Sequence, residues 1–181
     1  MFNENLKKGK DIQMRKGINI FHILFCFLFV ACEQRGEQWY RKFDKYEKQI
    51  DKKFPSVETP FPEHYDFLCM QETANNISFP RIIPSYAVLH FDKFYKSDIH
   101  LTFEQMNDII VILNDTANYC WGELGTPYFD RVITFHNSEG DCIGITYFDF
   151  GGQTYSYPFN SKMKWGLMRT NKLYELIRKI E

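Results

Sequence analysis

The stretch that decides the fold is RVITFHNSEGDCIGITYFDFGGQTYSY, residues 131–157. In its first part, residues 132–136, Ile133 and Phe135 alternate with the residues of the opposite face. A period of two indicates a β-strand that buries one face, because successive side chains of a strand point to opposite sides. We therefore predict that Ile133 and Phe135 face a core.

Two turn signals divide the rest of this stretch. Residues 137–140 have the composition of a four-residue hairpin loop, and the glycines at 151–152 predict a two-residue turn. The segments 142–150 and 153–157 are rich in β-branched and aromatic residues, which favour strands. The stretch is therefore predicted to be a three-stranded antiparallel meander. A sheet this small needs further strands or helices over its apolar face.

The clearest helix signal lies before the meander. Thr102 and Gln105 have the spacing of a capping box, and Asn114 or Asn118 is suited to end the helix. Apolar residues follow the cap at helical intervals, namely Phe103, Met106, Ile109, Ile110 and Leu113. A helix with one apolar side should cover the apolar face of the meander. The residues expected beneath it are Ile133, Phe135, Ile143 and Ile145.

Less regular patterns complete the domain. Residues 86–95 alternate like a strand, residues 171–180 have the pattern of a terminal helix, and residues 63–72 are compatible with a short helix. Residues 37–54 predict an amphipathic helix, which packs on the domain or, alternatively, binds a partner or a membrane surface. The predicted class is α+β, with a three- to five-stranded, mostly antiparallel sheet packed by helices on one face.

The first residues have the composition of an export signal. Arg15 and Lys16 precede an apolar run at 20–31, which is shorter than the roughly 20 residues of a membrane-spanning helix. The run ends in Leu28-Phe29-Val30-Ala31-Cys32, which resembles the lipobox of bacterial lipoproteins. The resemblance implies that Cys32 carries lipid such as palmitate and becomes the first mature residue. An uncleaved anchor and a buried core helix are the alternatives.

The resemblance to lipoproteins implies a place in the bacterial cell envelope, with the membrane as a partner through the lipid on Cys32. The implied plan is a signal peptide (1–31), a lipid anchor with an amphipathic helix (32–54) and a single α+β domain (55–181). The leader and the aromatic content also resemble small lipoproteins of the Bacteroidota. Asp115-Thr116-Ala117 resembles the O-glycosylation acceptor of exported proteins from that group.

The composition excludes some functions. A net charge of -1 supplies no strong field for holding nucleic acid, and 44% hydrophobic residues fit an ordinary globular protein. Cys69, Cys120 and Cys142 would remain after processing, and export makes one disulfide possible. We favour a bond between Cys120 and Cys142. The sequence lacks a C-x-x-C motif, so structural zinc has no support, and no cofactor is expected.

The first candidate site is the loop at 118–126, NYCWGELGT, because loops on a rigid scaffold commonly carry function. Its glycines fit neither a phosphate-binding loop nor a dinucleotide fingerprint. A cysteine hydrolase would need Cys120 and His136 to meet, with Asp130 or Asp149 orienting the base. None of the local signatures of such enzymes is present, so chance co-occurrence is the simpler explanation.

Two further sets of side chains are candidates for binding. His90, Asp92 and His100 could ligate a metal ion, although an exposed sheet face explains them more simply. The candidates for a surface that stacks on a sugar or a peptide are Trp121, Glu123, Tyr128, Tyr155 and Tyr157. Half-buried packing at a sheet edge is the alternative for the aromatic residues.

These patterns favour binding over catalysis. We expect a lipid-anchored envelope protein that acts as a non-enzymatic binding, inhibitor or immunity-type module for a protein or glycan partner. The alternative is a small envelope hydrolase that uses Cys120 or His136.

Overall fold

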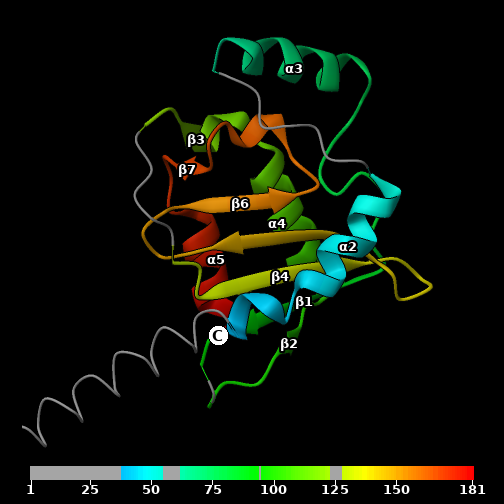
Figure 1. The fold of residues 1–181 in the computed structure, drawn as a ribbon. Coiled ribbons are helices and arrows are strands. Elements are labelled where there is room, and N and C mark those ends of the chain that lie inside the picture. Colours follow the sequence, from blue (N-terminus) through cyan, green and yellow to red (C-terminus); the bar gives the residue numbers. More distant parts are fainter. Residues whose placement is uncertain (1–37, 55–61, 94, 123–127) are drawn as a thin grey trace, which may run out of the picture. The chain divides into compact units, whose positions relative to one another are not determined.

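The computed structural model describes residues 38–54, 62–93, 95–122 and 128–181. The chain divides into two units, Met1–Asp44 and Lys45–Glu181, and the second unit holds both sheets (Figure 1). The predicted signal peptide and Cys32 lie outside the described residues. Within the described ranges, no helix has both the length and the apolar composition needed to cross a membrane.

Five antiparallel strands form the main sheet, in the order β2-β1-β4-β5-β6 (Figure 1). They are β1 (Tyr86–Phe91), β2 (Ile99–His100), β4 (Arg131–His136), β5 (Cys142–Phe148) and β6 (Thr154–Tyr157). Strands β4, β5 and β6 are neighbours in sequence order, which is the predicted meander. The α+β class with an antiparallel sheet is therefore confirmed.

Both hairpin loops of the meander contain three residues. The backbone N–H groups of Asn137 and Asp149 each donate to the carbonyl four positions later, at 3.0 Å. The glycine before each closing residue, Gly140 or Gly152, adopts a φ of 87°. This is a type I turn followed by a glycine bulge. The prediction of a two-residue turn at 151–152 is wrong, and the loop predicted at 137–140 is one residue shorter than predicted. The composition of a turn does not show which two residues form the hydrogen bond that closes it.

A β-bulge in β5 changes which side chains face the core. The register with β4 shifts between residues 135 and 136, and Ile143 is the extra residue, which stays in the core cluster. Ile145 pairs with Thr134, so it lies fully buried on the opposite face. The prediction that Ile145 lies beneath the covering helix is wrong, because simple alternation does not reveal an inserted residue.

Helices α4 (Phe103–Asn114) and α5 (Lys172–Ile180) cover one face of the main sheet (Figure 1). The predicted capping box is confirmed, since Gln105 N donates to Thr102 Oγ1 at 3.2 Å and Thr102 N donates to Gln105 Oε1 at 2.9 Å. The buried residues of the two helices are Met106, Ile109, Leu113, Leu173 and Ile177. Burying each such side chain stabilises the fold by roughly 1.5–3 kcal/mol.

Helix α2 (Asp44–Lys53) contacts the opposite face of the sheet through residues of the second unit. Tyr147 Oη donates to Glu47 Oε1 at 2.6 Å. The hydroxyl of Tyr157 donates to Asp51 one helical turn later. The amphipathic helix predicted within residues 37–54 therefore uses part of its polar side to pack on tyrosines of the meander.

Helix α3 (Pro62–Ala74) includes the short helix considered for residues 63–72. It is linked to the 3-10 turn η2 (Ser161–Met163), because Ser161 N donates to Glu72 Oε2 at 3.3 Å and Ser161 Oγ donates to the same atom. A helix with little amphipathic character is thereby positioned beside the segment that follows β6.

A second sheet contains two short strands, β3 (Tyr119–Cys120) and β7 (Leu167–Met168), after the 3-10 turn η1 (Thr116–Asn118). Cys120 therefore lies in a different sheet from Cys142 in β5. Both thiols are free, as is that of Cys69. The predicted disulfide between Cys120 and Cys142 is wrong, because β3 pairs with β7 and does not run beside β5.

Candidate functional site

The main candidate site is a recess of about 200 Å³ between α3, the edge strand β6 and the segment that follows β6. Four of the ten described residues that line it are aromatic. Tyr65 comes from α3, Tyr155 from β6, and Phe159 and Trp165 from the following segment, which also contributes Met163. We call this site the aromatic recess. Binding sites for small ligands are typically concave and mostly apolar, with a few polar groups that orient the ligand.

Edge-to-face contacts fix the aromatic walls. The ring centroid of Tyr65 lies 5.0 Å from that of Trp121 and 5.5 Å from that of Phe159. Trp121 lies in turn 5.3 Å from Trp165. Each such pair adds about 0.5–1.5 kcal/mol beyond the burial of its surface. Trp121 and Trp165 nevertheless remain 39% and 38% exposed, so part of the indole surface stays accessible to a ligand.

A close approach of two backbone segments builds one side of the recess. Thr154 donates to Gly166 O from its backbone N at 2.7 Å and from Oγ1 at 3.0 Å. Gly166 has a φ of 87°, and a Cβ there would lie 1.8 Å from Thr154 O. Only glycine fits at this position. Gly166 N also donates to Met163 O at 2.7 Å, which closes the turn that carries Lys164 and Trp165.

Tyr65, which lines the recess, carries an unsatisfied polar group. Tyr65 is 1% exposed, and its hydroxyl oxygen has no hydrogen-bond partner in the part of the chain that the structure describes. Burial, with a smaller contribution from Tyr155, raises the pKa of Tyr65 to about 12. The group is therefore a protonated donor at neutral pH.

Lys164 supplies the charge of the recess. Its Nζ donates one hydrogen bond to Tyr119 O at 3.0 Å, and an ammonium group has three N–H donors. Among the described residues that line the recess, none is Asp or Glu. Lys164 has φ 53° and ψ -123°, which costs a non-glycine residue on the order of 1–3 kcal/mol. Such strain is often retained where a side chain serves a ligand.

The structure brings two of the predicted binding residues to this site. Tyr155 lines the recess, and Trp121 contacts both Tyr65 and Trp165. Tyr157 and Tyr128 are directed elsewhere, since their hydroxyls donate to Asp51 and Asp92.

Three wall residues, Tyr65, Phe159 and Trp165, were not predicted from the sequence, and Glu123 lies outside the described residues. Phe159 and Trp165 follow the aromatic end of the meander, which is a weak signal. No sequence signal marks Tyr65 as a wall residue, because the apolar residues of α3 do not follow a helical period.

The candidate catalytic residues do not meet. The Cys120 thiol points to Leu167 O at 3.8 Å. His136 has Nδ1 3.2 Å from Gly140 O and Nε2 2.9 Å from Thr134 Oγ1. Asp130 pairs with Arg131, and Asp149 accepts from Gln153 N at 3.0 Å. Neither carboxylate orients the imidazole, as a hydrolase would require.

Thr134 joins two buried histidines. Its Oγ1 lies 3.0 Å from Nε2 of His90 and 2.9 Å from Nε2 of His136. Nδ1 of His90 lies 2.7 Å from Asp98 Oδ2. Thr134 is fully buried, so the Asp-His-Thr arrangement is closed to a substrate. Burial lowers the pKa of His136, although the hydrogen bond to Gly140 opposes the shift.

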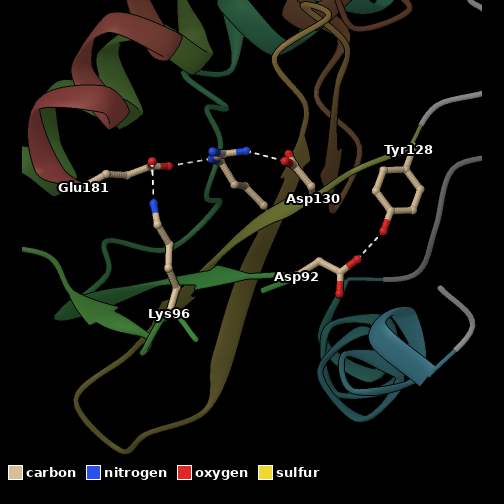
Figure 2. Close-up of polar contacts among 6 residues, drawn as sticks. Asp92, Lys96, Tyr128, Asp130 and Glu181 are labelled. Carbon is tan, nitrogen blue, oxygen red and sulfur yellow. Dashed lines mark hydrogen bonds and ion pairs between the residues drawn. The ribbon is translucent and has the colours of Figure 1, made fainter. Parts of the chain in front are cut away.

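The three predicted metal ligands are also directed to different partners. His90 bonds to Asp98, Asp92 accepts from Tyr128 (Figure 2), and the ring of His100 lies 6.3 Å from that of Tyr86. In the described ranges, no three His, Cys, Asp or Glu side chains are grouped so that they could hold a metal ion.

A charged cluster surrounds Arg131. Its Nε donates to Glu181 Oε1 at 2.6 Å and its Nη1 to Asp130 Oδ2 at 2.5 Å. Lys96 Nζ donates to the other carboxylate oxygen of Glu181 at 2.7 Å (Figure 2). The guanidinium carbon lies 3.4 Å from the ring centroid of Phe150. Each charged group is paired within the cluster, so the cluster stabilises the fold, although Asp130 Oδ1 is buried without a hydrogen-bond partner among the described residues.

Comparison with known proteins gave no match to a family model, a curated protein or a solved structure.

Proposed function

We propose that this chain is a non-enzymatic binding module, tethered to the bacterial cell envelope through lipid on Cys32, and that it holds its partner at the aromatic recess. The observation that carries the proposal is the buried, unpartnered hydroxyl of Tyr65, a residue that lines the recess together with the partly exposed Trp165. A buried polar group without a partner is costly. A ligand that hydrogen-bonds to Tyr65 removes this cost on binding.

Tethering is supported by the leader and the lipobox-like end at Cys32. Binding without catalysis is supported by the separate hydrogen-bond partners of Cys120 and His136. An inhibitor or immunity-type role fits a module of this kind, because such proteins act by occupying a partner and need no reacting group. The hydrolase alternative gains no support from these contacts.

The binding role is tested by ¹⁹F NMR on the full chain in detergent, labelled with 5-fluorotryptophan. The sequence has three tryptophans, so Trp121 and Trp165 report on the recess and Trp39 serves as an internal control. A panel of small aromatic compounds, saccharides and short peptides should contain a member that shifts the Trp121 and Trp165 resonances and leaves that of Trp39 unchanged. Shifts at Trp39 alone, or none with any member, contradict the proposed site.

The tether is tested separately by metabolic labelling with a palmitate analogue. The wild-type chain should incorporate label and enter the detergent phase, whereas Cys32→Ala should do neither. Label retained by Cys32→Ala contradicts lipidation at this residue. Alkylating the free thiols should leave binding at the recess intact, because none of the described residues that line it is a cysteine.

A further inference from the structure

We propose that the aromatic recess recognises an aromatic ring that carries a carboxylate. This inference rests on the proposed binding role and specifies its ligand. The ring would occupy the recess and pack against Tyr65, Phe159 and Trp165, and the carboxylate would accept hydrogen bonds from Tyr65 and Lys164.

The size and walls of the recess fit one aromatic ring. Its volume is about 200 Å³. An apolar cavity of about 150 Å³ binds benzene, so a ring with one short substituent fits. Tyr65 and Phe159 already meet edge to face, an arrangement that an incoming ring can extend. The thioether of Met163 adds a polarisable contact of the kind that favours aromatic partners.

The polar groups of the recess favour a ligand group that accepts hydrogen bonds and carries a negative charge. Tyr65 offers a buried O–H donor, and Lys164 offers N–H donors with a positive charge. The amide of Asn160 is engaged, because its Nδ2 donates to Leu113 O at 3.1 Å and its Oδ1 accepts from Lys162 N at 3.2 Å. A cationic ligand would meet Lys164 with no carboxylate to offset it among the described lining residues.

A saccharide is disfavoured by the same balance of groups. Sugar hydroxyls both donate and accept, so a site for them needs acceptors as well as donors. The hydroxyls of Thr154 and Ser156 are already used, by Gly166 O at 3.0 Å and by Thr146 Oγ1 at 2.8 Å. The described lining residues include the O–H donor of Tyr65 and the charged N–H donors of Lys164 but no carboxylate acceptor, which favours a ligand that is itself a carboxylate.

The position of Lys164 supports a ligand role for its side chain. Its φ of 53° is a conformation that glycine adopts without strain, so turn geometry does not explain why lysine stands there. Lys164 Nζ lies 5.9 Å from the ring centroid of Trp121. A carboxylate held there would form a charge-assisted hydrogen bond.

An aromatic ring with a carboxylate has two sources. It can be a free aromatic acid, or the last residue of a peptide that ends in Phe, Tyr or Trp. Phenylacetate represents the first source, and a tetrapeptide ending in Phe represents the second. The same peptide with an amidated end keeps the ring and loses the charge, so it is the matched control.

The test titrates these probes into the full chain labelled with 5-fluorotryptophan. Phenylacetate or the acid-ended peptide should shift Trp121 and Trp165, and phenylacetamide, phenethylamine, glucose and the amidated peptide should bind about tenfold more weakly or not at all. Tyr65→Phe and Lys164→Gln should each lower the affinity for phenylacetate and for the acid-ended peptide by several-fold to about tenfold. Tyr128→Phe and Lys172→Gln are the matched controls and should leave affinity unchanged.

Tyr65→Phe is suited to this test because the hydroxyl it removes has no partner in the described structure, so the fold is retained. Equal affinity for the acid, amide and amine overturns the inference and leaves the binding role standing. Tighter binding of glucose than of the acids also overturns the inference and leaves the binding role standing. If no probe of any class shifts Trp121 and Trp165, both the ligand class and the proposed site fail.

Discussion

Arg131 Nε donates to Glu181 Oε1 at 2.6 Å, which joins the central strand β4 to the last residue of the chain. The guanidinium is buried, so its charge depends on the two carboxylates beside it, those of Glu181 and Asp130. Removing one partner of a buried ion pair is costly, because the remaining charge stays out of water.

We expect Glu181→Gln to lower the free energy of unfolding by about 2 kcal/mol, since Asp130 keeps part of the interaction. Urea unfolding followed by circular dichroism measures this change. The control is Glu139→Gln in an exposed hairpin loop, which should change stability by no more than about 0.5 kcal/mol. Equal stability of the two variants would show that the Arg131 cluster does not stabilise the fold.

The same carboxylate predicts an acid-dependent loss of stability. Burial tends to raise the pKa of Glu181, but the hydrogen bonds and charges of Arg131 and Lys96 outweigh burial and lower it. A carboxyl group with a lowered folded-state pKa contributes stability above its unfolded value of about 4.3 and loses it as the pH falls further. Between pH 5 and pH 3, the wild type should therefore lose stability more steeply than Glu181→Gln. If the free energies of unfolding of the two proteins fall in parallel over this pH range, Glu181 is not the source of the acid-dependent loss.

His136 predicts a second effect at higher pH. Burial is the main cause of its lowered pKa, and the charges of His100 and Lys45 add to it. The folded state thus favours the neutral ring, and stability falls as the pH drops below the unfolded value of about 6.5. We expect the free energy of unfolding to decrease from pH 7.5 to pH 5.5, and less so in His136→Gln. The exposed His64, changed to Gln, is the control and should keep the wild-type slope.

Gly166→Ala tests the backbone contact beside the recess. The added Cβ would lie 1.8 Å from Thr154 O at a residue with φ 87°, so we expect a loss of about 3 kcal/mol in stability. Gly151→Ala is the matched control, because the atom nearest to its Cβ would be a side-chain oxygen of Asp149, at 3.1 Å. Thermal unfolding should separate the two variants clearly. Similar melting temperatures would contradict the close approach of Gly166 to β6.

Lys164→Gly should change stability and binding in opposite directions. Glycine relieves the strain of φ 53°, so unfolding should cost about 1 kcal/mol more, while binding of phenylacetate weakens. Lys162→Gly is the control, since Lys162 lies in η2 with an ordinary backbone conformation, and glycine there should destabilise by about 0.5–1 kcal/mol. A loss of stability in both variants would refute the strain argument. Chemical denaturation and the ¹⁹F titration measure the two effects.

The local parts of the fold could be predicted from the sequence because local patterns specify them. Thr102 and Gln105 mark the start of α4, and alternation through Ile133 and Phe135 marks β4. The bulge at Ile143 could not be predicted, because an inserted residue looks like any other member of a strand. Because of this bulge, Ile145 lies on the opposite face of the sheet, and its predicted contact with the covering helix is absent.

The recess could be predicted only in part, because it depends on contacts between residues far apart in the chain. Trp121 and Tyr155 are predicted binding-surface residues; Tyr155 lines the recess and Trp121 contacts its wall residue Tyr65. The placement of Tyr65 depends on how α3 packs, which the sequence of α3 does not indicate. The pairing of β3 with β7 was equally hidden, and it is the reason that Cys120 does not meet Cys142.

The hydrogen bonds that bring residues 166–168 against β6 also bear on self-association. Thr154 N donates to Gly166 O and Met168 N donates to Gly152 O, both at 2.7 Å, so the start of this edge strand is already paired. At the far edge, β2 is only two residues long. Two folded copies that meet edge to edge would have only short unpaired strand segments to join, so we expect little growth of an intermolecular β-sheet.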